Sequence, residues 1–326
     1  MRTLYSLILL LAVFAIAVAE EPAPLRQIAT IPLPNVSGRI DHMAVDTARK
    51  RLFVAALGNG SLEIVDLEKG AVVKSISHLS EPQGIAYAAD LDRVFVACGG
   101  DGSCRVFDGK SLELVKNVEL GADADNIRYD EKARRVYVGD VGLAILDAAN
   151  GKRLSDVKLM SHPESFQLES KGPRIFINIA HDGFVAVVDR NKRTVVARWP
   201  LTEARANFPM AYDETNRRQF VGCRKSPRLL VLDTTSGKTV ASALIDSDTD
   251  DLFYDSARRR IYVSCGVGLI DVIQQTDASH YQMSTKIPTA AGARTSLFVP
   301  AMNRFYLAVP HRGPQPAEIR VYEVLP

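Results

Sequence analysis

Apolar and polar positions repeat along this chain with a period of about 42 residues, from the end of an N-terminal leader to the last residue. Each repeat opens on an apolar position, and successive openings lie 42, 42, 39, 44, 42 and 45 residues apart. No segment keeps a helical spacing of apolar residues for more than about one turn. The pattern therefore predicts one unit built seven times, with openings at Met43, Ile85, Ile127, Phe166, Met210, Leu252 and Leu297.

Each repeat contains short stretches that are typical of β-strands. A basic residue precedes an apolar, aromatic, apolar triplet, as in RVFV at residues 93–96, and a later stretch often ends in Asp, as in IVD at residues 64–66. Such residues suit a pleated, half-buried strand. A four-stranded sheet buries both faces only against neighbours in a ring, so this period predicts an all-β fold, a seven-bladed β-propeller with four antiparallel strands per blade.

The two ends of the chain predict how the ring closes. The seventh repeat stops after its third strand, at residues 319–324, whereas a strand-like stretch at residues 25–31 precedes the first repeat. An N-terminal strand that completes the last blade would remove an otherwise open sheet edge. We therefore expect the two termini to latch the propeller.

The first 19 residues have the pattern of a secretory signal peptide. A basic start precedes an apolar run at residues 4–17, and small residues at 17–19 offer a cleavage site. The run is short for a membrane span of about 20 residues. We expect a signal peptide at residues 1–19, one propeller domain at residues 20–326, no membrane span after cleavage, and a periplasmic or secreted protein.

Charge and cysteine content narrow the function classes. Removing Arg2 with the leader lowers the formal net charge from +2 to +1. A mature protein with a net charge this close to zero does not attract nucleic acid by its overall charge. Cys98 and Cys104 flank a predicted hairpin turn, which makes them a disulfide candidate in an oxidising compartment, with the reduced state equally open. Cys223 and Cys265 are expected to be small buried residues.

The predicted loops on the two faces of the ring differ in character. The turns after the first strands are repetitive and begin with Asp, as at Asp46 and Asp130, where Asp bonds its own backbone. The loops that lead into the first strands differ from one another, as a binding surface requires. Because first strands lie innermost, positions two residues before each opening should ring the channel mouth: Asp41, Gln83, Asp125, Glu164, Phe208, Asp250 and Thr295.

This ring and its neighbours supply the candidate ligand-binding residues: Arg39, Asp41, Gln83, Asp125, Asn126, Glu164, Arg205, Asn207, Asp250 and Arg294. Crowded carboxylates repel, and raised pKa values, arginines or a bound cation relieve the repulsion. Calcium, which takes six to eight oxygens, is the candidate cofactor. Its candidate ligands are Asp41, Asp125, Glu164 and Asp250, with Asn126 beside them; salt bridges to arginine are the alternative.

Three segments resemble a known repeat: RLFVAALGNGSLEIVD at residues 51–66, RVYVGDVGLAILD at 135–147 and RIYVSCGVGLIDV at 260–272. They resemble the YVTN repeat, and the mature chain is similar to YncE-like seven-bladed propellers. That resemblance implies an extracytoplasmic binding protein, and relatives are linked with single-stranded DNA. Binding single strands requires stacking aromatics beside a positive track. Phe208 is the one clear aromatic near an acidic centre, so we do not expect nucleic-acid binding here.

We therefore expect an exported, monomeric binding or interaction module for a protein, peptide or small polar ligand. The alternative is a lactonase-like hydrolase or lyase, with or without calcium, because related propellers place such chemistry at this mouth. Acid–base catalysis needs paired groups within hydrogen-bond reach. The catalytic candidates are His162, Glu164, His42 and His311, and His162 with Glu164 forms the first pair to test.

Overall fold

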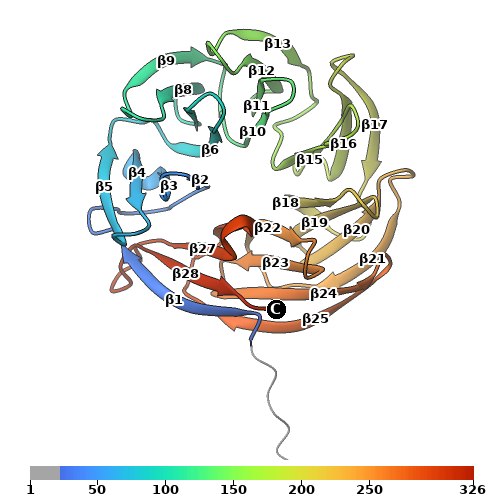
Figure 1. Ribbon diagram of the computed structural model, residues 1–326. Coiled ribbons are helices and arrows are strands. Elements are labelled where there is room, and N and C mark those ends of the chain that lie inside the picture. Colours follow the sequence, from blue (N-terminus) through green and yellow to red (C-terminus); the bar gives the residue numbers. More distant parts are fainter. Residues whose placement is uncertain (1–22) are drawn as a thin grey trace, which may run out of the picture.

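The computed structural model describes residues 23–326, and the predicted signal peptide lies outside the described residues. The described chain forms seven separate four-stranded sheets, which stand in a ring (Figure 1), and residues of their first strands line a central channel. The predicted seven-bladed, all-β propeller is therefore confirmed. Helical structure within residues 23–326 is limited to two 3-10 turns, η1 (Leu57–Asn59) and η2 (Pro300–Met302), and no described helix is long and apolar enough to span a bilayer.

The first four blades follow the sequence order of their strands. Blade 1 contains β2 (Met43–Asp46), β3 (Arg51–Ala56), β4 (Ser61–Asp66) and β5 (Ala71–Ile76). Blade 2 contains β6 (Pro82–Ala88), β7 (Arg93–Cys98), β8 (Ser103–Asp108) and β9 (Leu114–Glu119). Blade 3 contains β10 (Ile127–Asp130), β11 (Arg135–Gly139), β12 (Leu143–Asp147) and β13 (Arg153–Val157). Blade 4 contains β14 (Phe166–Leu168), β15 (Arg174–Ile179), β16 (Phe184–Asp189) and β17 (Thr194–Pro200).

The remaining blades close the ring. Blade 5 contains β18 (Arg205–Asp213), β19 (Arg218–Lys225), β20 (Arg228–Asp233) and β21 (Thr239–Leu244). Blade 6 contains β22 (Thr249–Asp255), β23 (Arg260–Cys265), β24 (Leu269–Asp277) and β25 (His280–Pro288). Blade 7 contains β26 (Thr295–Val299), β27 (Arg304–Val309), β28 (Glu318–Val324) and the N-terminal β1 (Leu25–Pro32).

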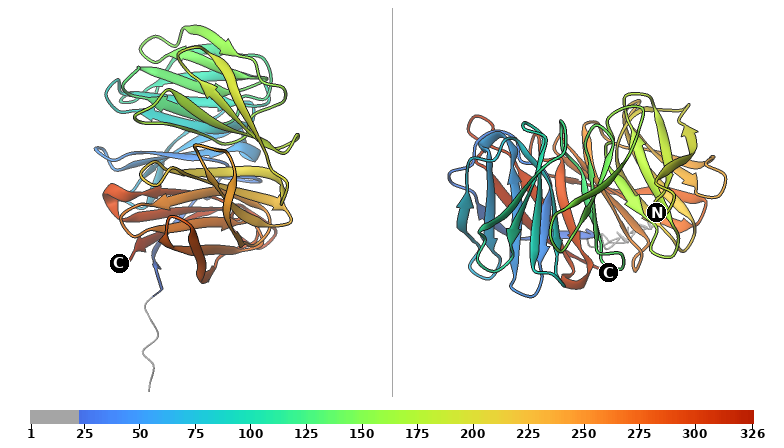
Figure 2. Two further views of the ribbon diagram at one scale, coloured as in Figure 1. Left: turned by 90° about the vertical axis from the view of Figure 1, so that its right-hand side faces the viewer. Right: turned by 90° about the horizontal axis from the view of Figure 1, so that it is seen from above.

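First strands surround the channel and fourth strands form the rim (Figure 1). The strands run between two faces of the ring (Figure 2). We call one the mouth face; it carries the loops that lead into the first strands and the loops between second and third strands. The other two sets of loops form the rear face.

The latch predicted from the chain ends is confirmed. In Figure 1, β1 lies along β28, and the two pair antiparallel from Leu25 opposite Val324 to Ile31 opposite Ile319. A bulge at Ile28 interrupts this register. One extra residue reverses which side chains face which side of a sheet. Leu25 therefore packs into the core between blades 6 and 7, whereas Ile31 packs into the core between blades 7 and 1.

The same bulge recurs in the fourth strand of every blade, and it accounts for most apolar side chains exposed on the rim. The register shifts skip one residue of each fourth strand. The bulged residue leaves the ladder unpaired, so its side chain stays outside the interblade cores. The skipped residues are Ile28, Val73, Val115, Leu154, Val196, Val240 and Ser284; the six apolar ones are exposed.

Aspartates of the rear face have structural roles. Asp108 accepts backbone hydrogen bonds from Ser111 (2.9 Å) and Lys110 (3.0 Å), which hold its pKa below the usual range. It also accepts a side-chain hydrogen bond from the guanidinium of Arg93 at 2.8 Å. These contacts start the turn and tie the second strand to the third.

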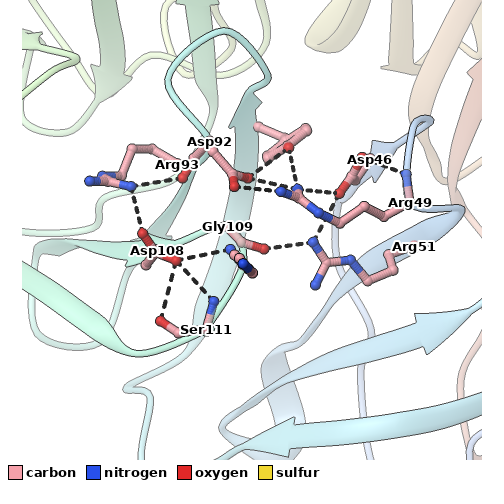
Figure 3. Close-up of polar contacts among 10 residues, drawn as sticks. Asp46, Arg49, Arg51, Asp92, Arg93, Asp108, Gly109 and Ser111 are labelled. Atoms are coloured by element: carbon pink, nitrogen blue, oxygen red, sulfur yellow. Dashed lines mark hydrogen bonds and ion pairs between the residues drawn. The ribbon is translucent and has the colours of Figure 1, made fainter.

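A rear-face network also joins neighbouring blades (Figure 3). Arg49 of blade 1 donates to both carboxylate oxygens of Asp92 in blade 2, at 2.8 and 2.6 Å. Arg51 donates to Asp46 at 2.9 Å and to the Gly109 carbonyl of blade 2 at 2.6 Å. Bidentate contacts of this kind fix geometry as well as adding energy. Their donors and acceptors are therefore engaged within the fold.

The predicted disulfide between Cys98 and Cys104 is wrong for this structure, because both thiols are free and buried. In the β7–β8 ladder Cys98 lies opposite Ser103, and Cys104 lies opposite Ala97. Adjacent pairs in a ladder face opposite sides of the sheet. Cys98 consequently packs between blades 1 and 2, and Cys104 packs between blades 2 and 3. Cys223 and Cys265 are buried, as expected.

Candidate functional site

A repeated backbone contact fixes the residues at the channel mouth. The amides of Asp41, Asp125 and Glu164 donate to carbonyls of their own second strands, at Ala55 (2.7 Å), Gly139 (2.9 Å) and Asn178 (2.9 Å). The contact anchors each lead-in loop to the rigid sheet just before the first strand begins. The side chains at these positions therefore start from equivalent points around the ring.

A close backbone approach sets the position of Asp125. Gly84 lies in β6, the first strand of the preceding blade, and a Cβ atom there would lie 2.1 Å from the Asp125 carbonyl oxygen. Only glycine leaves room for the backbone at such a distance. The absence of a side chain at Gly84 thus allows the Asp125 loop to approach the channel.

These loops enclose a polar cavity of about 380 Å³ at the mouth. Six of the seven predicted ring positions line it. The exception is Thr295, which is buried and donates to the Ile40 carbonyl at 3.2 Å. The complete lining is Arg39, Asp41, His42, Leu57, Glu81, Gln83, Asp123, Asp125, Asn126, His162, Glu164, Ser165, Phe208, Arg224, Asp250 and Arg294.

Arginine neutralises the acidic groups on one side of the cavity. Arg39 donates to Asp41 at 2.7 Å. Arg294 contacts Asp250 at 2.9 Å, and Arg224 donates to the other oxygen of Asp250. Arg224 also lies over the Phe208 ring, 3.6 Å from its centroid, a cation–π contact. We call this set the arginine side of the mouth.

His42 is held as a cation between two carboxylates. Its Nδ1 lies 3.3 Å from Asp251, and its Nε2 lies 3.8 Å from Asp41. Burial disfavours the charged ring, but Asp251 and Asp41 outweigh burial and raise the pKa of His42 to about 10. His42 therefore holds its proton at neutral pH and does not fit the predicted role of a general base.

The opposite side of the cavity carries two carboxylates, Asp125 and Glu164, that pair with no arginine or lysine of the described residues. Within the described residues, the side chains of Asp125 and Glu164 make no hydrogen bond and no ion pair. Burial and then repulsion from Asp125 raise the pKa of Glu164 to about 8. Burial and repulsion from Asp41 likewise raise the pKa of Asp125. We call Asp125, His162 and Glu164, with Asp123 and Asn126, the carboxylate side.

Three predicted site residues lie outside the cavity lining. β18 begins at Arg205, so its backbone pairs with Lys225 and its side chain is exposed. A bulge after Asn207 turns that side chain into the sheet, where it is buried and donates to Asn178 at 2.9 Å. His311 is exposed in the loop between β27 and β28.

Two acidic lining residues, Glu81 and Asp123, were not predicted from the sequence. Both adopt the left-handed backbone region, with φ values of 50° and 49°. Each lies two residues before a ring position, and Asp248 repeats this arrangement with a φ of 61°. An acidic residue two positions before a ring position recurs in the sequence, and this recurrence could have indicated these two lining residues. Their left-handed backbone conformation could not be predicted, because a residue other than glycine adopts it only uncommonly.

Comparisons with known proteins establish the fold and no family. No protein-family model matches the chain, and no curated protein matches it; the YVTN and YncE resemblance therefore stays a prediction. A solved structure titled Kuenenia stuttgartiensis hydrazine synthase is 14% identical, with a TM-score of 0.74, covering 85% of this chain and 93% of that one.

Two WD40-type structures also match. The RRP9 WD40 repeats are 10% identical, with a TM-score of 0.79, covering 92% of this chain and 98% of that one. U3-55K is 10% identical, with a TM-score of 0.78, covering 94% of this chain and 100% of that one. Similarity at this identity concerns the propeller fold alone.

Proposed function

We propose that this chain is an exported, noncatalytic interaction module that receives a positively charged group of a peptide or small polar ligand at the channel mouth. The observation that carries the proposal is the unpaired state of Asp125 and Glu164. The described structure gives neither carboxylate a cationic partner, whereas the rear-face aspartates are engaged in turns and interblade contacts. A cation placed between the two carboxylates would relieve their repulsion.

The lining also supports the polarity of the ligand. Six carboxylates line the cavity against three arginines and the protonated ring of His42, and two of those carboxylates, Asp41 and Asp250, are already paired with arginine. A cationic ligand is favoured by this excess, and a polyanion such as nucleic acid is disfavoured. The propeller fold, with its individual loops on one face, supports an interaction role.

Peptide binding to the mature protein tests the proposal. The probes are a fluorescein-labelled lysine-rich peptide and a peptide of equal length in which glutamate replaces every lysine. The D125N/E164Q variant removes the unpaired acids at the mouth. The E68Q/E131Q variant removes two exposed acids of the rear face and matches the number of acidic side chains replaced.

We expect the lysine peptide alone to bind, and we expect D125N/E164Q to abolish that binding while E68Q/E131Q preserves it. Equal loss in both variants would show a general charge effect and would refute the mouth as the site. Thermal melts check that both variants fold.

One observation favours a second candidate function, a hydrolase or lyase of the lactonase type. Glu164, with a pKa of about 8, holds a proton at neutral pH, and His162 lies beside it. A protonated carboxylic acid next to a basic ring provides a general acid and a general base. Turnover of a panel of lactones by wild type, lost in Glu164→Gln, would support this candidate; an inactive wild type would remove it.

A further inference from the structure

The carboxylate side of the mouth combines nitrogen and oxygen ligands in one place. One potential ligand atom from each of Asp125, His162 and Glu164 lies within 4.8 Å of the other two. We propose that these three residues hold a divalent transition-metal ion of the zinc class. The inference rests on the proposed function, because the same unpaired carboxylates, Asp125 and Glu164, would hold the ion in place of the ligand's positive group.

The spacing is close to what a metal requires. Nitrogen and oxygen ligands bind zinc at about 2.0–2.2 Å, which places two ligands of a tetrahedral ion roughly 3.4 Å apart. Contraction from the observed spread of at most 4.8 Å is within the reach of side-chain rotation.

Unpaired buried atoms point independently to a ligand. The side chain of Asn126 is part of a residue only 4% exposed, and its Oδ1 has no hydrogen-bond partner within the described chain. One oxygen of Asp125 is likewise inaccessible and unpaired. Both residues line the mouth cavity. Buried polar atoms are almost always satisfied, so these two oxygens indicate a group that binds there, and Asn126 offers a further ligand.

The ring of His162 is oriented as metal-binding histidines are. Its Nδ1 lies 3.0 Å from the carbonyl oxygen of Asp140. With the proton on Nδ1, that nitrogen donates to the carbonyl and Nε2 keeps a lone pair for a metal. Such a hydrogen bond fixes the tautomer and the direction of the ring. The carbonyl of Asp140 therefore acts as a positioning group for the proposed site.

The available ligands favour zinc over calcium. Calcium takes six to eight oxygens, and the sequence-based prediction drew them from four carboxylates. Two of these, Asp41 and Asp250, are neutralised by arginines. The remaining oxygens come from Asp125, Glu164 and Asn126, and His162 adds an imidazole, a ligand that suits zinc and related metals.

Calorimetric titration of chelator-treated mature protein with zinc chloride, and in parallel with calcium chloride, tests the assignment. We expect one zinc per chain, weaker binding of calcium, and a higher melting temperature with zinc. His162→Gln should weaken zinc binding at least tenfold. The matched control is His181→Gln, because His181 is an exposed histidine outside the cavity lining, and it should leave zinc binding unchanged.

Three results would overturn the metal site: no zinc binding, equal zinc affinity in His162→Gln and wild type, or calcium binding tighter than zinc. Binding of the lysine peptide to metal-free His162→Gln separates the two proposals, since that variant keeps both carboxylates. Peptide binding without zinc binding would reject the metal alone. A wild-type protein that binds neither zinc nor the lysine peptide would reject the proposed function as well.

Discussion

The N-terminal latch offers a demanding prediction about stability. Leu25 and Ile31 are each 3% exposed, and the bulge at Ile28 sends them into different interblade cores. Truncating a buried Leu or Ile to Ala costs about 2–5 kcal/mol. Contributions of separated sites add, so L25A/I31A should lose about 4–10 kcal/mol, out of the roughly 5–15 kcal/mol that stabilises a typical domain. Ile28→Ala, at an exposed position, is the matched control.

Urea unfolding followed by tryptophan fluorescence measures this loss. The single tryptophan, Trp199, packs between blades 4 and 5, far around the ring from the latch. We expect L25A/I31A to lower the unfolding midpoint at Trp199, because an open ring loses support for every blade, and Ile28→Ala to leave it nearly unchanged. An unchanged midpoint in L25A/I31A, or an equal loss in Ile28→Ala, would show that burial of Leu25 and Ile31 does not hold the ring closed.

Three further predictions concern buried groups. Burial raises the pKa of Asp271 from 3.8 to about 6. Protonation of this carboxyl therefore favours the folded state, and its contribution to the free energy of unfolding is complete below pH 3.8 and disappears as the pH rises through 6. Asp271→Asn should be more stable than wild type at pH 7 by on the order of 1–3 kcal/mol, and equal unfolding free energies at pH 7 would contradict this. Gly84→Ala should displace the Asp125 loop and weaken lysine-peptide binding at least tenfold while the protein stays folded; unchanged affinity would show that the Asp125 backbone does not depend on Gly84. The four thiols should resist Ellman's reagent until urea unfolds the chain, because burial raises the pKa of Cys98 to about 11 and of Cys223 to about 12; rapid labelling of native protein would contradict their burial.

The fold was predictable because its signals are periodic and local. The apolar openings, such as Met43 and Ile127, mark the first strands of the repeats. The unmatched strand at residues 25–31 had one repeat to complete, the seventh, which supplies three strands where the others supply four. The ring positions followed from the same register. Asp41, Asp125, Glu164 and Asp250 all reach the mouth cavity because equivalent strands place equivalent loops around one axis.

The remaining site details depend on single-residue shifts that a repeat pattern does not reveal. Cys98 and Cys104 do not form a disulfide because they are not opposite each other in the ladder. Cys98 lies opposite Ser103 and Cys104 lies opposite Ala97, so the two thiols lie on opposite faces of the sheet. The bulge after Asn207 removed that side chain from the mouth. Asp123 lines the cavity with a left-handed backbone conformation, which the recurrence of acidic residues at its offset does not reveal.

Zero-length crosslinking tests whether a positive group of the ligand lies between Asp125 and Glu164. A carbodiimide joins a carboxylate to a lysine amine only when the two are in contact, and peptide mass mapping then identifies the acid. With the lysine-rich peptide bound, we expect adducts at Asp125 or Glu164. Adducts confined to rear-face acids such as Glu68 and Glu131, with none at the mouth, would contradict it.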